Sequence, residues 1–187
     1  MLDPELPPPT DPELTPRQLL AELESHLGEA AAAELCAELL TSDDPHDHLN
    51  ALVFLGGRAG ESVLAGGSWK PYWARVWGAR GLLYVWSDSV TGTVLTGLRD
   101  EHWRVAEMCL KVSAKRELPG ADDAAHLATH ELSRVRIAAL RVLGSSGEVE
   151  HAQQVTEALA DQDEAVRRAA ARALDRLATR LDLSVTR

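Results

Sequence analysis

An internal repeat is the feature that most constrains how this chain can fold. The segment DQDEAVRRAAARAL at residues 161–174 matches HELSRVRIAALRVL at residues 130–143, 31 positions earlier. A further step of 32 positions reaches another strong match that begins at residue 98, and steps of 29 and 27 reach weaker matches that begin at residues 69 and 42. Units this short cannot bury their own apolar faces, so consecutive units must stack and bury one another. The repeat therefore predicts an all-α solenoid of about five helical hairpins.

Two columns of the aligned repeat indicate how the units would pack. One column is mostly arginine, namely Arg167, Arg136, Arg104, Arg75 and finally His48. Two positions later the last three units have alanine, which lets neighbouring helices approach closely. Acids lie four residues before the arginine column in three units, at Asp163, Asp100 and Asp44. We expect each arginine to pair with an acid of the preceding turn or of an adjacent unit, and so to align the repeats.

A period near 30 with an acidic turn, an arginine and an alanine-rich helix resembles the HEAT repeat, in particular the short bacterial repeats grouped as phycobilin-lyase-like. The resemblance covers roughly residues 29–180. The residues that carry it are Asp163, Val166, Arg167, Ala169, Ala170 and Leu174, with Val135, Arg136, Ala138, Ala139 and Leu143. It implies an armadillo-like, right-handed α-α superhelix whose second helices line a concave, partner-binding face. Because such scaffolds serve many unrelated functions, the resemblance specifies the fold better than the function.

The N-terminal segment has a different composition from the repeats. Residues 1–14 contain five prolines among four acids, which predicts a disordered acidic tail. Thr15 followed by Pro16 is typical of a helix start, and leucines at helical spacing continue to a natural stop at Gly28. We therefore expect a capping helix and a repeat domain over residues 15–187.

The charge is unevenly distributed along the chain. The net charge is −10, from 29 acids and 19 bases, and residues 1–50 hold twelve of the acids but one base. Overall acidity disfavours binding to nucleic acid or to an anionic membrane through bulk charge. No apolar run is long enough to span a membrane, and the N-terminus does not resemble a secretory signal. These features predict a cytoplasmic protein without a membrane partner.

Aromatic residues gather in one segment. Six of the eight aromatic residues lie between positions 69 and 86, and Trp69, Trp73 and Trp77 share one side of a helix. Tryptophan, tyrosine and arginine dominate binding hot spots, so this segment is a candidate partner-binding site. The alternative is a core role, because the preceding segment at residues 58–66 is poor in large side chains.

A second candidate is a cationic column five residues after the arginine column, which reads Arg172, Arg141, Cys109, Arg80 and Val53. If this column lines a groove, its arginines would hold carboxylates or phosphates. A further possibility is that the acidic tail itself occupies that groove. The alternative is a solvated helix surface. We add Trp103, the next tryptophan along the chain, to these candidates. The candidate partner-binding residues are Trp69, Tyr72, Trp73, Trp77, Arg80, Trp103, Arg141 and Arg172.

The sequence offers little for catalysis or for metal binding. His126 and His130 share a helix face, and His46 and His48 flank Asp47, but neither set has the further ligands that a metal site needs. Cys36 and Cys109 have apolar neighbours, which predicts buried free thiols. Glycine-rich phosphate-binding motifs are lacking. We expect no catalytic residue, metal or cofactor.

These observations favour a non-catalytic scaffold that binds a protein or peptide on its helical-repeat surface. The alternative is an enzyme that acts on nucleic acid, since HEAT-like alkylpurine DNA glycosylases also place tryptophans and arginines on a concave face. The resemblance to the phycobilin-lyase-like group leaves a lyase or chaperone-like subunit as a third possibility. The oligomeric state stays open.

Overall fold

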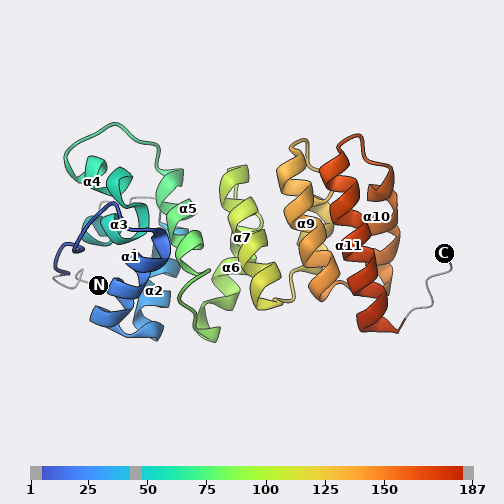
Figure 1. Cartoon of the computed structure of the whole chain (residues 1–187), viewed down its shortest axis with the longest axis horizontal. Coiled ribbons are helices and arrows are strands. Elements are labelled where there is room, and N and C mark those ends of the chain that lie inside the picture. Colours follow the sequence, from blue (N-terminus) through green and yellow to red (C-terminus); the bar gives the residue numbers. More distant parts are fainter. Residues whose placement is uncertain (1–5, 43–47, 183–187) are drawn as a thin grey trace. The chain divides into compact units, whose positions relative to one another are not determined.

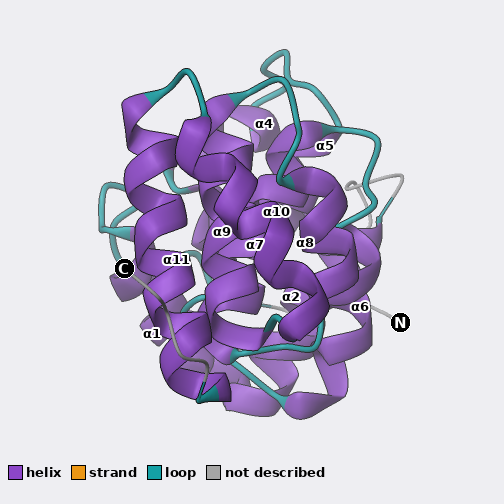
Figure 2. Ribbon diagram, turned by 90° about the vertical axis from the view of Figure 1, so that its right-hand side faces the viewer, coloured by secondary structure: helices purple, strands orange, loops and turns teal. Residues whose placement is uncertain are grey.

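The computed structural model describes residues 6–42 and 48–182, and these form helices joined by turns without any strand (Figures 1 and 2). The predicted all-α solenoid fold is confirmed. Within the described ranges, no helix is both long and apolar enough to cross a membrane. The chain divides into two compact units, residues 1–97 and residues 98–187, which are described separately.

The first unit is built from short helices. They are α1 (Pro16–Leu27), α2 (Glu29–Thr41), α3 (Leu49–Gly56), α4 (Arg58–Leu64), α5 (Tyr72–Gly81), the 3-10 turn η2 (Asp88–Val90) and α6 (Thr91–Gly97). α1 begins with a capping box, in which the Thr15 side chain accepts from the Gln18 amide and the Gln18 side chain accepts from the Thr15 amide. Pro16 occupies the first turn of α1, where its missing amide hydrogen costs nothing.

Helices α2 and α5 pack closely because α5 contains two glycines that face α2. A Cβ atom on Gly78 would lie 2.8 Å from the Leu40 amide nitrogen, and one on Gly81 would meet the Cys36 side chain. Cys36 is fully buried in this contact, and Cys109 is buried in the second unit. Both cysteines are free, so the prediction of buried free thiols is confirmed.

Residues 6–14 of the acidic, proline-rich segment, whose composition predicts disorder, lie against the first unit. Pro9 is buried, and the Thr10 amide donates to the Glu22 carboxylate at 3.0 Å. Glu13 forms an ion pair with Arg58 at the start of α4. Because proline restricts the backbone already in the unfolded chain, few contacts are needed to hold such a segment in place.

The second unit contains three long helices and two short ones. They are α7 (Trp103–Arg116), α8 (Ala121–Leu127), α9 (Ser133–Ser146), α10 (Ala152–Glu157) and α11 (Glu164–Leu181), with 3-10 turns η3 (Val149–His151) and η4 (Ala158–Ala160) on either side of α10. α9 packs between α7 and α11, α8 packs on α9, and α10 packs on α11. The unit is therefore α7 followed by two helical hairpins, α8–α9 and α10–α11.

The long helices give the register of the repeat. α7, α9 and α11 begin at Trp103, Ser133 and Glu164, so the steps are 30 and 31 residues rather than the predicted 32 and 31. In this register Arg104 corresponds to Arg134, not to Arg136. The predicted membership of Arg104 in the arginine column is therefore wrong.

The turns before the long helices show why consecutive repeats are 30 and 31 residues apart. Asp100 accepts from the His102 amide at 2.8 Å, and His130 Nδ1 accepts from the Leu132 amide at 3.0 Å. Asp161 accepts from the Asp163 amide at 2.8 Å in the same way. Each side chain stabilises the turn that leads into the next long helix. Histidine and aspartate can both accept this bond, so matching by residue type alone misses the equivalence.

Candidate partner-binding surface

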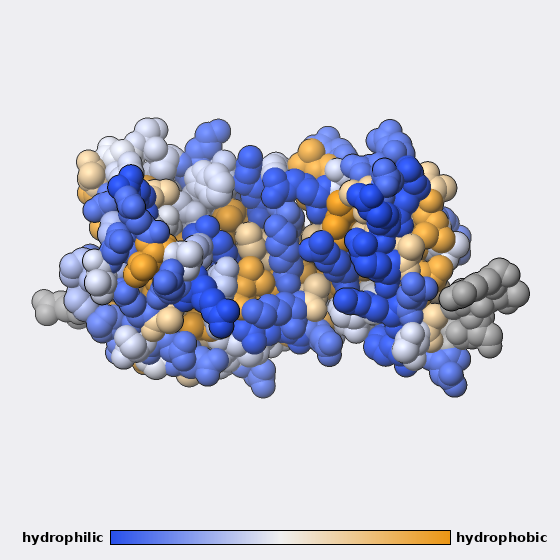
Figure 3. Space-filling view, in the orientation of Figure 1, coloured by the Kyte–Doolittle hydropathy of each residue, from blue (hydrophilic) through white to orange (hydrophobic). Residues whose placement is uncertain are grey.

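One face of the second unit carries cationic side chains at equivalent positions of its three long helices. Lys111, Arg141 and Arg172 correspond to one another when α7, α9 and α11 are aligned by their first residues. Arg141 and Arg172 are exposed, and the Lys111 side chain is 31% exposed. α9 packs beside both other helices, so the three cations form a row across them. Figure 3 shows strongly hydrophilic side chains gathered over α9 and α11.

Arginines also run along α11 at four-residue spacing. All four are exposed, namely Arg168, Arg172, Arg176 and Arg180. Arg168 pairs with Glu164 at 2.6 Å, and Arg180 lies 3.5 Å from the Glu148 carboxylate. Among the described residues, Arg172 and Arg176 have neither a hydrogen bond nor an ion pair through their side chains. This arginine ridge and the row of Lys111, Arg141 and Arg172 together form what we call the cationic face.

Trp103 organises two further cations beside this face. The tryptophan is half-buried at the start of α7, and the guanidinium of Arg104 lies 4.2 Å from the centre of its ring. The guanidinium of Arg134, from α9, lies 5.0 Å from the ring centre. Both distances are within the range of cation–π attraction. The ring therefore holds arginines of two neighbouring helices together at their N-terminal ends.

A buried acid, Glu107, lies beneath the cationic face. Its side chain is 5% exposed and contacts Lys111 Nζ at 2.8 Å and Arg134 Nη2 at 2.9 Å. One carboxylate thus fixes two cations and connects α7 with α9. Sequence reasoning missed this residue. The available signal was an acid four residues before a lysine, at the position that Ile137 occupies in the next repeat.

Three exposed acids of this unit lie outside its long helices. Asp122 is on α8, Glu150 is on η3 and Glu157 is on α10, and all three are exposed. His151 is buried and its Nε2 lies 3.2 Å from Asp122 Oδ1, while its Nδ1 accepts from the Glu148 amide. The short helices thus carry exposed acids and neither lysine nor arginine, whereas the long helices carry the cations together with Glu107, Glu164 and Asp175.

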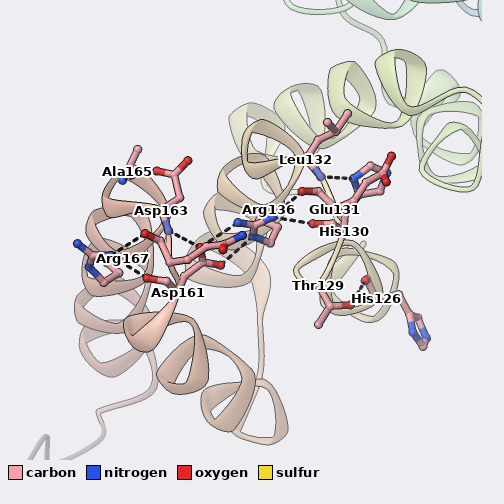
Figure 4. Close-up of polar contacts among 11 residues, drawn as sticks. His126, Thr129, His130, Glu131, Leu132, Arg136, Asp161, Asp163, Ala165 and Arg167 are labelled. Carbon is pink, nitrogen blue, oxygen red and sulfur yellow. Dashed lines mark hydrogen bonds and ion pairs between the residues drawn. The ribbon is translucent and has the colours of Figure 1, made fainter.

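The arginine column has a structural role, as predicted, at its last two positions (Figure 4). Arg136 pairs with Asp161 of the following repeat and donates to the carbonyls of His130 and Glu131. Arg167 likewise donates to the carbonyls six and five residues before it. The predicted partner Asp163 instead caps α11, where it accepts from the Ala165 amide at 2.8 Å. Asp44, the first acid of this series, lies outside the described residues.

The aromatic segment of the first unit forms a stack. The Trp77 ring centre lies 6.1 Å from that of Trp69 and 6.2 Å from that of Trp73, and Tyr72 contacts Trp73 at 5.3 Å. Trp77 is 6% exposed and covers Gly56, where a Cβ atom would lie 2.9 Å from the ring. Trp77 therefore belongs to the core. Trp69, Tyr72 and Trp73 are half-buried and reach the surface.

Arg80 belongs to the first unit, whereas Arg141 and Arg172 belong to the second. Its side chain is half-buried and donates to the carbonyl of Leu55. Burial lowers the pKa of Arg80, since a charged guanidinium is less stable away from water. Arg80 is thus a separate feature, beside a cavity of the first unit.

Metal binding and thiol chemistry find no support in the described part of the chain. Within residues 6–42 and 48–182, no three metal-ligating side chains come together. His46, one of the histidines considered from the sequence, lies outside these ranges. Burial raises the pKa of Cys36 to about 12 and also raises the pKa of Cys109, so both thiols stay protonated.

Comparison with known proteins identifies the type of repeat. Residues 124–185 match the family model for HEAT repeats, a stretch that includes α9, α10 and α11. The predicted resemblance to HEAT repeats is confirmed, whereas the narrower bacterial group remains a prediction. A search of the curated proteins finds no match to the chain.

Proposed function

Because the chain carries HEAT repeats over residues 124–185, we propose that it is a non-catalytic interaction module that binds an acidic segment of a protein partner on its cationic face. HEAT repeats generally mediate protein–protein interaction, and their stacked helices present extended binding surfaces. The single observation that carries the proposal is the row of Lys111, Arg141 and Arg172 at equivalent, accessible positions of three neighbouring helices.

The spacing of the cations suits an acidic peptide. Packed helices lie about 9 Å apart, so the row from Lys111 to Arg172 extends over about 18 Å. Along α11, arginines four residues apart recur about every 6 Å. An acidic helix presents carboxylates at the same interval when they are four residues apart. A strand presents carboxylates that are two residues apart about every 6.7 Å. The planar guanidinium can hold each carboxylate by two parallel hydrogen bonds.

Glu107 contributes to this surface by positioning rather than by binding. Because it is buried beneath Lys111 and Arg134, it holds both side chains at fixed places and reduces the conformational entropy that they lose when a partner binds. Trp103 has the same effect on Arg104 and Arg134. We propose Trp103, Arg141 and Arg172 as the main contacts of the second unit.

The half-buried aromatic residues of the first unit remain a secondary candidate contact. Trp69, Tyr72 and Trp73 present part of their rings to the surface, so they form a candidate contact of the first unit by itself. Trp77 serves packing, because its ring is covered. Arg80 lines a separate cavity of the first unit.

Charge reversal tests the proposal. We expect Arg141→Glu/Arg172→Glu to weaken binding of a fluorescently labelled, glutamate-rich peptide by about tenfold or more, an effect of about 1.4 kcal/mol. The matched control is Arg17→Glu/Lys70→Glu, which changes the net charge equally at exposed positions of the first unit. Equal losses in the two double variants would show non-specific attraction and contradict the proposal.

A nucleic-acid-acting enzyme is the second candidate, favoured by one observation. Trp103 with Arg104 and Arg134 combines an aromatic ring with two guanidiniums, a combination that also suits bases and phosphates. Competition distinguishes the two candidates. If duplex DNA displaces the acidic peptide at physiological salt and binds more tightly than it, the second candidate is correct and the first is wrong.

A further inference from the structure

The first unit contains a cavity that neither the HEAT repeats nor the cationic face explains. It has a volume of about 430 Å³ and lies between the N-terminal segment and the helices α1, α3, α4 and α5. Its lining includes two arginines, Arg58 and Arg80, and the apolar side chains of Leu14, Pro16 and Leu19. The cavity thus combines a cationic side with an apolar floor.

Arg80 is the charged group of this cavity that lacks an anionic partner. It is half-buried, and its hydrogen bond is to a neutral group, the Leu55 carbonyl. Among the described residues, no carboxylate pairs with its guanidinium. A partly desolvated cation without a counterion is unfavourable, and a bound carboxylate would relieve this. The side chain therefore favours an anionic ligand for this cavity.

The N-terminal segment covers the cavity without neutralising Arg80. Glu13 pairs with Arg58 at the rim, where both side chains are more than half exposed. The Pro12 carbonyl lies against Gly57, where a Cβ atom would come within 2.9 Å of it. Exposed ion pairs of this kind contribute little to stability. Residues 9–13, which we call the strap, are thus held by the buried Pro9, by the hydrogen bond from Thr10 to Glu22 and by this exposed ion pair, contacts that a competing peptide has to replace.

The strap also indicates what kind of ligand fits. Its sequence, Pro9-Thr10-Asp11-Pro12-Glu13, is a short acidic peptide with prolines, and its last two residues line the cavity. Proline-containing peptides lose little conformational entropy on binding, which makes them common ligands of such grooves. In the chain, Glu13 is tethered next to α1 and pairs with Arg58, whereas the glutamate of a free peptide with the same sequence is not tethered and can reach Arg80.

We propose that this cavity is a second binding site, in which Arg80 and Arg58 take the carboxylate of an acidic, proline-flanked peptide segment of a partner protein. The strap occupies the mouth of the site in the free protein and competes with that peptide. This site is independent of the cationic face, because its residues all belong to the first unit. If the cavity does not bind the peptide, the proposed function of the cationic face is unaffected. If the cationic face does not bind an acidic partner, the proposed cavity site is likewise unaffected.

The test uses the full chain and a labelled peptide with the sequence of residues 6–14, LPPPTDPEL. The variant Glu13→Gln weakens the strap, so we expect it to bind the peptide about fivefold more tightly than the wild-type chain does, the effect of losing one exposed ion pair. The matched control is Glu24→Gln, an equal charge change at an exposed position of α1, which should leave the affinity unchanged.

Two further comparisons identify the role of the carboxylate. Adding Arg80→Gln to the Glu13→Gln chain should abolish the increase in peptide affinity. A thermal melt shows whether this double variant is folded. Replacing the glutamate of the peptide by glutamine should have the same effect with the protein intact. The proposal is overturned if Glu13→Gln and Glu24→Gln bind the peptide equally, or if the acidic and the neutral peptide bind equally.

Discussion

Arg136 of α9 and Asp161 of the turn before α11 form a two-pronged ion pair between consecutive repeats. Nε and Nη2 of the arginine each donate to one oxygen of the carboxylate at 2.8 Å. Nη1 donates to the carbonyls of His130 and Glu131 at 2.8 and 2.9 Å. The two side chains are 9% and 14% exposed, so this pair is largely shielded from water. One arginine thus joins the turn of its own hairpin to the turn of the next.

Removing this arginine should destabilise the second unit. Arg136→Ala leaves the Asp161 carboxylate and two carbonyls without their donor, and we expect a loss of about 3 kcal/mol in the free energy of unfolding. Arg141→Ala, on the same helix but exposed, should change it by less than about 0.5 kcal/mol. Urea unfolding of both variants checks this. Similar midpoints for the two would contradict the structural role of Arg136.

The same pair makes stability depend on pH in the acid range. The Arg136 guanidinium, by hydrogen bonding, holds the pKa of Asp161 below its usual value. The unfolded chain therefore binds a proton at higher pH than the folded chain does. The resulting stabilisation is complete above about pH 4 and is lost as the pH falls through the lower, folded pKa.

We expect urea unfolding between about pH 5 and pH 2 to show this loss in the wild-type chain. Asp161→Asn should lower stability near neutral pH and show a smaller decline toward acid, because asparagine can still accept from the Asp163 amide but does not titrate. The two curves should converge at low pH. Parallel curves over the whole range would show that Asp161 is not responsible.

Close packing of α9 against α11 depends on Gly144. A Cβ atom there would lie 2.9 Å from the Ala173 Cα, which is backbone and cannot move aside. We expect Gly144→Ala to lower the free energy of unfolding by about 1–3 kcal/mol. Gly92→Ala, on α6, meets nothing within 4 Å and should cause no loss. Thermal melts of the two variants test this, and equal melting temperatures would be inconsistent with the packing.

The buried thiols should be unreactive in the folded protein. Burial raises the pKa of Cys36 to about 12, and that of Cys109 is raised as well, so hardly any thiolate exists near pH 8. A colorimetric disulfide reagent should react with both thiols in denaturant. In buffer it should react with either thiol much more slowly. Rapid reaction of either cysteine in buffer would contradict its burial.

Much of the fold followed from the sequence because stacking leaves a periodic signal. The alanine and arginine columns of the last two repeats are where the alignment put them, with Ala138 and Ala169 buried and Arg136 and Arg167 on the turns. The register of α7 did not follow, because it depends on which side chain accepts the turn hydrogen bond. Aspartate at 100 and histidine at 130 perform the same task but do not align by type.

The candidate surface was partly predictable. Arg141 and Arg172 were identified from the column, but Cys109 was placed beside them where Lys111 belongs, an error of two residues that follows from the register. Glu107 could not be identified, because burial of an acid is visible only once both of its cationic partners are located. Trp77 was included as a contact since spacing alone cannot distinguish a buried ring from an exposed one.

The position at which an acidic peptide binds tests the central claim most directly. We expect amide chemical-shift mapping with the glutamate-rich peptide to show the largest changes on the exposed residues of α9 and α11 around Arg141 and Arg172, with further changes near Lys111. The short helices α8 and α10, which carry exposed acids and neither lysine nor arginine, should change little. Changes confined to α8 and α10, or to the first unit, would contradict the claim that the cationic face is the binding surface.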